Sequence, residues 1–264
     1  MLKSKLIQNI EKIAPPNLAL DWDNTGVQID VGEDTVKRAL VALEITDAVI
    51  REAQTVSADY IITHHPLLFH KIQRVDGHSV TGSQIIRLIR AGISVYSAHT
   101  SFDAVYGGNN DYLAELLDLR KIRRFQPKNE TPDQEIIGKI GDLSREMSLA
   151  EVCALLQERL EIRHSLPVVG NPESRIQKVG LCTGGGGDMI EDAVRNACSL
   201  FITGDVRHHE ALLAEESGIC LINAGHFGTE WIFVKNFAGR LKTAVGDVVE
   251  VVESRMGKDP FRYL

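Results

Sequence analysis

The feature that most restricts the fold of this chain is a short apolar run that ends in two adjacent histidines. Residues 60–63 (Tyr-Ile-Ile-Thr) form the kind of run that a buried strand requires, and His64, His65 and Pro66 follow directly. Because proline cannot continue a central strand, we expect both histidines at the carboxyl end of a strand, where open α/β sheets hold their ligand sites. Neighbouring strand residues point to opposite faces, so the two imidazoles converge only where the backbone turns. Otherwise each serves a different metal, or one is a core histidine and the other is exposed.

The segments around this run predict an α/β protein. Strands are expected at residues 39–43, 60–63 and 93–96, with helices near 46–55 and 84–91 between them. Strands that alternate with helices are typical of a mostly parallel sheet.

The second half of the chain repeats this order of elements. Apolar runs at 179–183, 200–203 and 219–223 correspond to the first three strands. We therefore expect two similar α/β units that face each other, each a mostly parallel sheet flanked by helices. The polar segment 126–137 is the best linker candidate, which predicts units of residues 1–125 and 126–264.

Each repeat brings an imidazole and a carboxylate to the end of a strand. His99 is followed four residues later by Asp103, and His226 is followed four residues later by Glu230. The first unit adds the histidine pair, whereas the second has Gly-Asp at the matching positions. Imidazole and carboxylate ligands together suit a borderline divalent ion such as zinc, manganese, iron or nickel.

The number of these ligands predicts two ions. Five or six ligands exceed what one catalytic ion needs, whereas two ions about 3.5–4 Å apart, bridged by a carboxylate and a water, use them all. A water that bridges two ions loses a proton near neutral pH and can attack carbon or phosphorus. His99 and His208 are the candidates for proton transfer in such a hydrolysis.

Composition excludes several other classes of protein. A net charge of −7 argues against broad electrostatic capture of nucleic acid, and no nucleic-acid partner is expected. The apolar runs are far too short for a membrane span, and residues 1–7 lack the apolar core of a signal peptide. The four cysteines have no paired spacing, so we expect a reducing, cytoplasmic environment.

Three further features have a structural interpretation. The glycine run 184–187 could offer N–H groups to an anion, but Met189 interrupts the dinucleotide-binding pattern, and we interpret the run as a turn. His209 is expected to begin an exposed helix, and His208 either does the same or touches substrate. Trp22 is interpreted as a core packing residue and not as a base-stacking platform.

Five segments of the chain resemble a known family. Residues 22–26, 62–67, 97–103, 203–209 and 224–230 are similar, in order, to the characteristic segments of the Nif-three-like family of dinuclear-metal proteins. Its members are often labelled homologues of the type 2 form of GTP cyclohydrolase I. The resemblance covers nearly the whole chain.

This resemblance implies two similar α/β domains in a ring-shaped homohexamer, with metal sites that face an inner cavity. It implies that the metal ligands are the residues at matching motif positions: His64, His65, Asp103, His226 and Glu230. His99 matches a motif residue and is placed beside these ligands or as a displaceable one. The implied activity is hydrolysis of a purine nucleotide such as GTP, opened at its imidazole ring. The alternative is a non-enzymatic metal-binding ring that binds a protein partner or handles metal.

Overall fold

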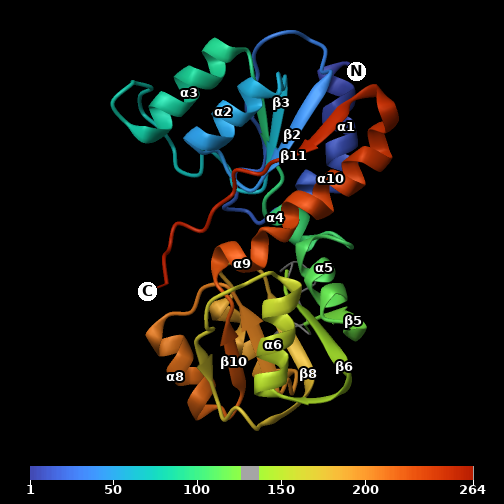
Figure 1. Cartoon of the computed structure of the whole chain (residues 1–264), viewed down its shortest axis with the longest axis vertical. Coiled ribbons are helices and arrows are strands. Elements are labelled where there is room, and N and C mark those ends of the chain that lie inside the picture. Colours follow the sequence, from blue (N-terminus) through green and yellow to red (C-terminus); the bar gives the residue numbers. More distant parts are fainter. Residues whose placement is uncertain (126–136, 264) are drawn as a thin grey trace. The chain divides into compact units, whose positions relative to one another are not determined.

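The computed structural model describes residues 1–125 and 137–263, which form two compact α/β units (Figure 1). The first unit contains Met1–Val105 and Phe233–Lys258, and the second contains Tyr106–Ile232 and the residues from Asp259 on. This composition differs from the expected division into 1–125 and 126–264. Residues 106–125 join the second unit, and the segment 233–258 returns to the first.

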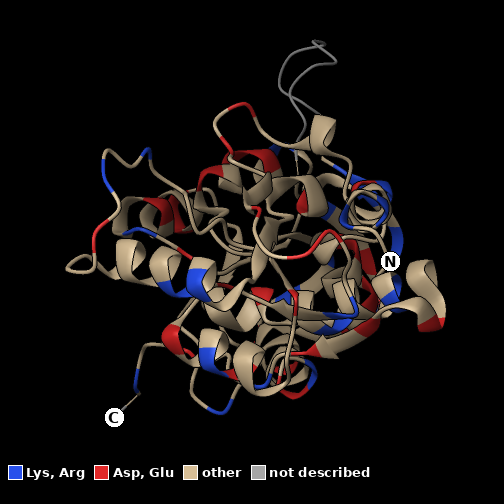
Figure 2. Cartoon of the chain, turned by 90° about the horizontal axis from the view of Figure 1, so that it is seen from above, with Lys and Arg blue, Asp and Glu red and all other residues tan. Residues whose placement is uncertain are grey.

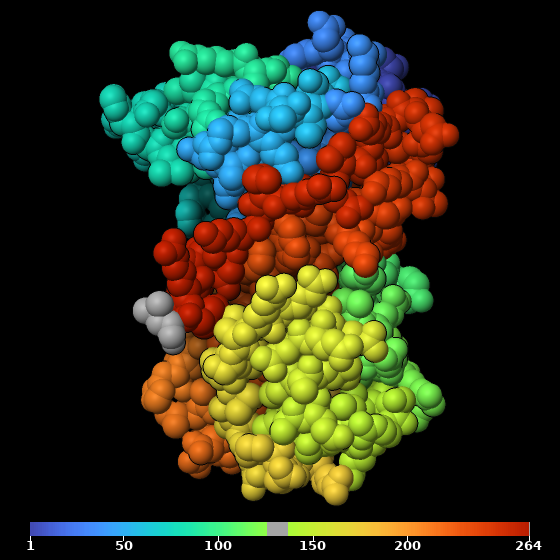
Figure 3. All heavy atoms as spheres, viewed as in Figure 1, coloured from blue at the N-terminus to red at the C-terminus, as the bar shows by residue number. Residues whose placement is uncertain are grey.

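The first unit is built on a five-stranded sheet in the order β1-β4-β3-β2-β11. Four strands are parallel: β2 (Arg38–Ala42), β3 (Tyr60–Thr63), β4 (Ser94–Ser97) and β11 (Glu250–Glu253). The edge strand β1 (Gly26–Ile29) pairs antiparallel with β4. The C-terminal part of the chain returns to this sheet, where β11 pairs with β2, a strand far away in the sequence. Figure 3 shows this red C-terminal segment packed against the blue segments of the same unit.

The helices of the first unit lie on both sides of its sheet, with α2 and α3 on one side and α1 and α10 on the other (Figure 1). Their bounds are α1 (Lys3–Ile13), α2 (Asp47–Thr55), α3 (Val80–Ala91), α4 (Thr100–Ala104) and α10 (Ile232–Val245). Thr46 caps α2 by accepting a hydrogen bond from the Val49 N–H, as the sequence predicts. Buried aliphatic side chains such as Ile50, Ile61 and Val95 fill the core between the sheet and α2 and α3.

The second unit is built on a six-stranded sheet in the order β5-β6-β8-β9-β10-β7. The parallel centre consists of β8 (Arg175–Cys182), β9 (Leu200–Thr203) and β10 (Cys220–Asn223). Antiparallel strands flank it: β5 (Arg120–Arg124), β6 (Lys139–Ser148) and β7 (Val168–Val169). The helices are α5 (Asn109–Leu116), α6 (Leu149–Arg159), α7 (Ile190–Arg195), α8 (His208–Glu216) and α9 (His226–Glu230).

The predicted repeat is present as a shared order of parallel strands. The first unit runs β2-α2-β3-α3-β4 and the second runs β8-α7-β9-α8-β10. Thr63 is in register with Ser97, and Thr203 is in register with Asn223, so the carboxyl ends of neighbouring strands meet in each unit. The two-unit α/β fold is confirmed, and it places the candidate site residues just beyond these strand ends.

Two further features are the distribution of charged residues and the length of the helices. Figure 2 shows acidic and basic segments interspersed over the ribbon, in a chain of 36 acidic and 29 basic residues. Among the described residues, each helix is too short or too polar to cross a membrane.

Candidate metal centre

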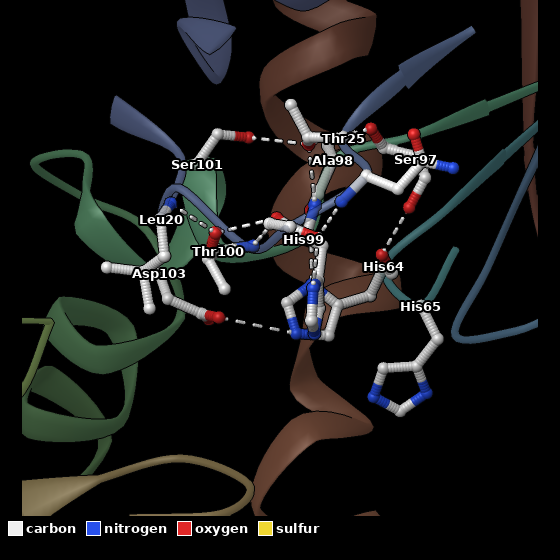
Figure 4. Close-up of polar contacts among 12 residues, drawn as sticks. Leu20, Thr25, His64, His65, Ser97, Ala98, His99, Thr100, Ser101 and Asp103 are labelled. Carbon is white, nitrogen blue, oxygen red and sulfur yellow. Dashed lines mark hydrogen bonds and ion pairs between the residues drawn. The ribbon is translucent and has the colours of Figure 1, made fainter. Parts of the chain in front are cut away.

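Three histidines of the first unit converge at the carboxyl ends of β3 and β4 (Figure 4). His64 and His65 follow β3 directly, and His99 follows β4 as the N-cap of α4. One nitrogen of each ring lies within 4.8 Å of a nitrogen of the other two. The ring centroid of His64 lies 5.2 Å from that of His65 and 5.1 Å from that of His99.

The backbone after β3 explains why two adjacent histidines share one site. The N–H groups of His64 and His65 both donate to the carbonyl oxygen of Leu43, at 3.1 and 2.9 Å. A regular ladder cannot place two successive N–H groups on one acceptor, so the strand has ended and the chain turns here. The turn removes the alternation of faces, and it brings the two imidazoles together.

The contacts of His64 select one tautomer of its ring. Its Nδ1 lies 3.1 Å from the carbonyl oxygen of Ala98, which can only accept, so Nδ1 carries the hydrogen. In the neutral ring, Nε2 of His64 then presents a lone pair, and it lies 3.6 Å from Oδ2 of Asp103. The His64 side chain is fully buried and that of Asp103 nearly so. A buried lone pair and a carboxylate that face each other suit a cation that both can bind.

His99 is oriented by a buried carboxylate from another loop. Its Nδ1 lies 2.8 Å from Oδ1 of Asp23, and the other carboxylate oxygen accepts hydrogen bonds from the backbone N–H and the hydroxyl of Thr100. Burial alone would raise the pKa of Asp23, but the hydrogen bonds from His99 and Thr100 outweigh burial and lower it. Asp23 is therefore an anion that accepts the Nδ1 hydrogen of His99 and leaves its Nε2 for other chemistry.

His65 has the same arrangement, with a third acceptor. Its Nδ1 lies 3.2 Å from Oε2 of Glu44, a residue just beyond β2. All three imidazoles thus direct Nδ1 to an oxygen. Histidines that bind metals usually direct one ring nitrogen to such an acceptor, which fixes the tautomer and the ring orientation. The donor set of the first unit fits a borderline divalent ion.

The second unit contributes a histidine and a carboxylate one helical turn apart. His226 and Glu230 begin and end α9, and Nε2 of His226 lies 2.9 Å from Oε2 of Glu230. Its Nδ1 lies 2.6 Å from Oδ2 of Asp205. Burial alone would lower the pKa of His226, but the hydrogen bonds and negative charges of Glu230 and Asp205 outweigh it and raise the pKa to about 9. Without metal, the protonated ring therefore faces one carboxylate with each nitrogen. A divalent ion between Nε2 and Glu230 could replace the Nε2 proton.

The glycine run packs tightly behind this pair. Gly184 has a φ of +66°, and a Cβ built on it would lie 1.9 Å from Oε1 of Glu230. Its N–H donates to the hydroxyl of Thr229 at 2.9 Å, and the N–H of Gly186 donates to the hydroxyl of Thr203 at 2.9 Å. These two N–H groups are engaged within the fold, which supports the interpretation of the run as a turn and not as an anion cradle.

His208 and His209 are the first two residues of α8, and both are exposed. Within the described part of the chain, the clusters of three or more potential metal ligands do not include either residue. The structure thus brings His64, His65 and His99 together within the first unit, with Asp103 beside His64.

The sequence did not assign an orienting role to the three carboxylates that hold the rings, although Asp205 was noted at a strand end as a residue that could touch substrate. Asp23, Glu44 and Asp205 each follow or precede a strand end, and this position was the available signal. The interpretation of Trp22 as a core residue was wrong, because its side chain is 62% exposed.

Comparison with known proteins identifies the family of the chain and supports the fold. A family profile described as Duf34/NIF3 (NGG1p interacting factor 3) matches residues 1–260. A "GTP cyclohydrolase 1 type 2 homolog" of Clostridium perfringens is 34% identical over 264 residues and covers 100% of both chains. The crystal structure of a Bacillus cereus protein related to NIF3 matches with a TM-score of 0.92 at 22% identity, over 100% of this chain and 99% of the other. The solved protein ybgI matches with a TM-score of 0.82 at 26% identity, over 96% and 97% of the two chains.

The fold and the site together define a two-unit α/β protein with a histidine and carboxylate cluster that could hold a metal ion. The chain belongs to the Duf34/NIF3 family, as the resemblance of its five segments indicated.

Proposed function

We propose that this chain binds two divalent metal ions and is a metal-dependent hydrolase. The observation that carries the proposal is the convergence of three imidazoles, each with Nδ1 turned to an oxygen acceptor. His64 is fully buried and the other two imidazoles are partly buried, and gathering such polar groups around one point costs stability unless they bind something there. The ions would be zinc, iron, manganese or nickel, since these accept mixed nitrogen and oxygen ligands.

The proposed ligands are those at the motif positions: His64, His65, Asp103, His226 and Glu230. The first three rest on the contacts of the first unit. His226 and Glu230 are included on the family resemblance and on their matching place in the repeat. His99 is proposed as a displaceable ligand or as a proton carrier.

When bound, two such ions lower the pKa of a coordinated water and polarise the substrate. The protein supplies the remaining parts. Asp23 holds the Nδ1 hydrogen of His99, so that its Nε2 can accept a proton from a reacting group. Ala98 and Glu44 keep the rings of His64 and His65 in the tautomer that a metal requires. His208, exposed at the start of α8, is the second proposed proton carrier.

The proposed substrate is a purine nucleotide, opened by hydrolysis at its imidazole ring. This substrate class comes from the names of two relatives, which are called homologues of GTP cyclohydrolase 1 type 2. The alternative is a non-enzymatic metal-binding ring that binds a protein partner or handles metal. A metal coordination position open to water favours the enzyme, and a site closed by protein ligands favours the alternative.

Metal content of purified, folded variants tests the metal centre. Glu230→Ala should lose nearly all bound metal if its carboxylate is shared by both ions, because each ion then loses a ligand and the charge between them. His64→Ala should lose mainly one ion. His209→Ala, at an exposed position next to the site segment, is the control and should retain full metal content.

Normal metal content in Glu230→Ala would remove that residue from the site, and loss of metal in His209→Ala would place the centre elsewhere. The metal-loaded wild type should then be screened against GTP and phosphoesters. Full metal content without turnover of any of these compounds would favour the non-enzymatic alternative.

A further inference from the structure

Two large aromatic side chains stand exposed beside the histidine cluster of the first unit. Trp22 is 62% exposed and Phe69 is 50% exposed. Their ring centroids lie 6.0 Å apart, and each contacts the same imidazole, since the centroid of His99 is 5.9 Å from Trp22 and 6.1 Å from Phe69. Single exposed aromatic residues are common, but these two form a continuous group with a histidine of the candidate metal centre.

Hydrogen bonds hold the backbone next to Phe69 in place. The N–H of Leu68 donates to Oε1 of Gln28 at 3.1 Å, and its carbonyl oxygen accepts from Nδ2 of Asn24 at 2.7 Å. Gln28 in turn donates from Nε2 to the carbonyl oxygen of Asn24 at 2.7 Å. Asn24, in the loop that carries Trp22, and Gln28, in the following strand β1, therefore fix the segment that presents Phe69.

The backbone on both sides of Trp22 is equally fixed. The N–H of Leu20 donates to the hydroxyl of Thr100 at 3.0 Å, and the N–H of Asp23 donates to the carbonyl oxygen of Leu20 at 2.9 Å. The carboxylate of Asp23 is bound to His99 and Thr100. The residue that orients the imidazole is thus the neighbour of the exposed indole, and the aromatic pair and the metal centre share one scaffold.

The geometry of the pair suits a flat ligand. The two ring planes are inclined by 61°, so a third planar ring can stack on one face while its edge meets the other ring. An aromatic ring buries roughly 150–250 Å², so two half-exposed rings offer far less than the roughly 800 Å² per partner of a stable protein interface. A small planar group fits this area better than a second protein surface.

We propose that Trp22 and Phe69 form the stacking platform for the nucleobase of the substrate. This inference rests on the proposed function, because contact with His99 places the base next to the groups that would act on it. A nucleobase supplies the π face that aromatic platforms recognise, and such stacking is tolerant of base identity.

Tryptophan fluorescence gives a direct test, because the chain has two tryptophans. In a Trp231→Phe background, Trp22 is the single reporter. GMP and UMP should both quench its emission, and ribose 5-phosphate, which lacks a base, should leave it unchanged. Base stacking is worth about 1–3 kcal/mol, so Trp22→Ala and Phe69→Ala should each weaken GMP binding by about tenfold, measured by calorimetry. Trp22→Phe should retain most of the affinity.

The control is Phe261→Ala, which removes an aromatic side chain that is 75% exposed elsewhere in the chain and should leave GMP binding unchanged. Equal affinity of Trp22→Ala and wild type for GMP would overturn the proposal. So would absence of GMP binding by the wild type, equal quenching by ribose 5-phosphate, or a change of oligomer mass in Trp22→Ala without a change in GMP affinity. Metal content separates the two proposals. Purified wild type that contains no metal would contradict the proposed function. A Trp22→Ala variant that has full metal content and binds GMP as tightly as wild type would contradict the stacking platform alone.

Discussion

Replacement of Gly184 by alanine should damage the second half of the site although no candidate ligand is itself replaced. Its φ of +66° lies in the left-handed region, which costs an L-residue about 1–2 kcal/mol. The new Cβ would also lie 1.9 Å from Oε1 of Glu230, so the carboxylate must move by more than an ångström. That movement breaks its 2.9 Å contact with His226, a charge-assisted hydrogen bond of about 1.5–3 kcal/mol. We expect Gly184→Ala to lower the free energy of unfolding by about 3 kcal/mol.

Gly185→Ala is the matched control, one residue along the same run. A Cβ there would meet nothing closer than Oδ2 of Asp205 at 3.9 Å, and the residue is exposed. Its unfolding free energy should stay within about 1 kcal/mol of wild type. Urea denaturation of the two metal-free variants measures the difference, and metal content should fall in Gly184→Ala alone. Equal stability and equal metal content in both variants would refute the role assigned to Gly184.

Three further outcomes are expected. Light scattering should give about six times the 29.2 kDa chain mass if the chain forms the hexameric ring that the resemblance implies, and a monomer at micromolar concentration would contradict it. The buried ammonium of Lys139 lies 2.9 Å from Oδ2 of Asp111, so Asp111→Ala leaves a buried charge without its counter-ion and should lower the free energy of unfolding by about 3–5 kcal/mol. The double variant Asp111→Leu with Lys139→Met removes both charges and should recover most of that loss, as measured by urea denaturation. The raised pKa of His226, about 9 against an ordinary 6.5, contributes stability to the metal-free protein that is fully present below pH 6.5 and lost as pH rises through 9. The urea midpoint should show this fall, and His226→Gln should lack it.

Local pattern was sufficient to predict most of the first unit. The apolar run 60–63 is β3, and the cap at Thr46 starts α2, because burial of a strand and capping of a helix are properties of a few adjacent residues. The proline after the histidine pair correctly marked the end of the strand. The sequence also predicted that His64 and His65 could converge only if the backbone turned after the strand, and the structure has a turn there.

Long-range pairing was not visible in the same way. The division at residues 125 and 126 followed a polar segment, but α10 and β11 return to the first unit, where β11 pairs with β2 about two hundred residues earlier. A strand of four residues gives no local sign of its distant partner. Trp22 was misplaced for a related reason, since the backbone beside it is held by a residue far along the chain, where the hydroxyl of Thr100 accepts a hydrogen bond from the N–H of Leu20.

At the candidate site, residue spacing predicts which side chains could bind a metal, and tertiary structure decides which nitrogen of each ring carries the hydrogen. The positions of His64, His65 and His99 after strand ends identify them as possible ligands, but an imidazole binds metal only through a nitrogen that lacks hydrogen. That choice is made by the oxygen atoms opposite Nδ1, and these come from a backbone carbonyl after β4 and from the carboxylates of Asp23 and Glu44. Each acceptor is 21 to 76 residues from its histidine along the chain. The sequence can therefore name candidate ligands, whereas the tautomer that would let them bind a metal is a property of the folded unit.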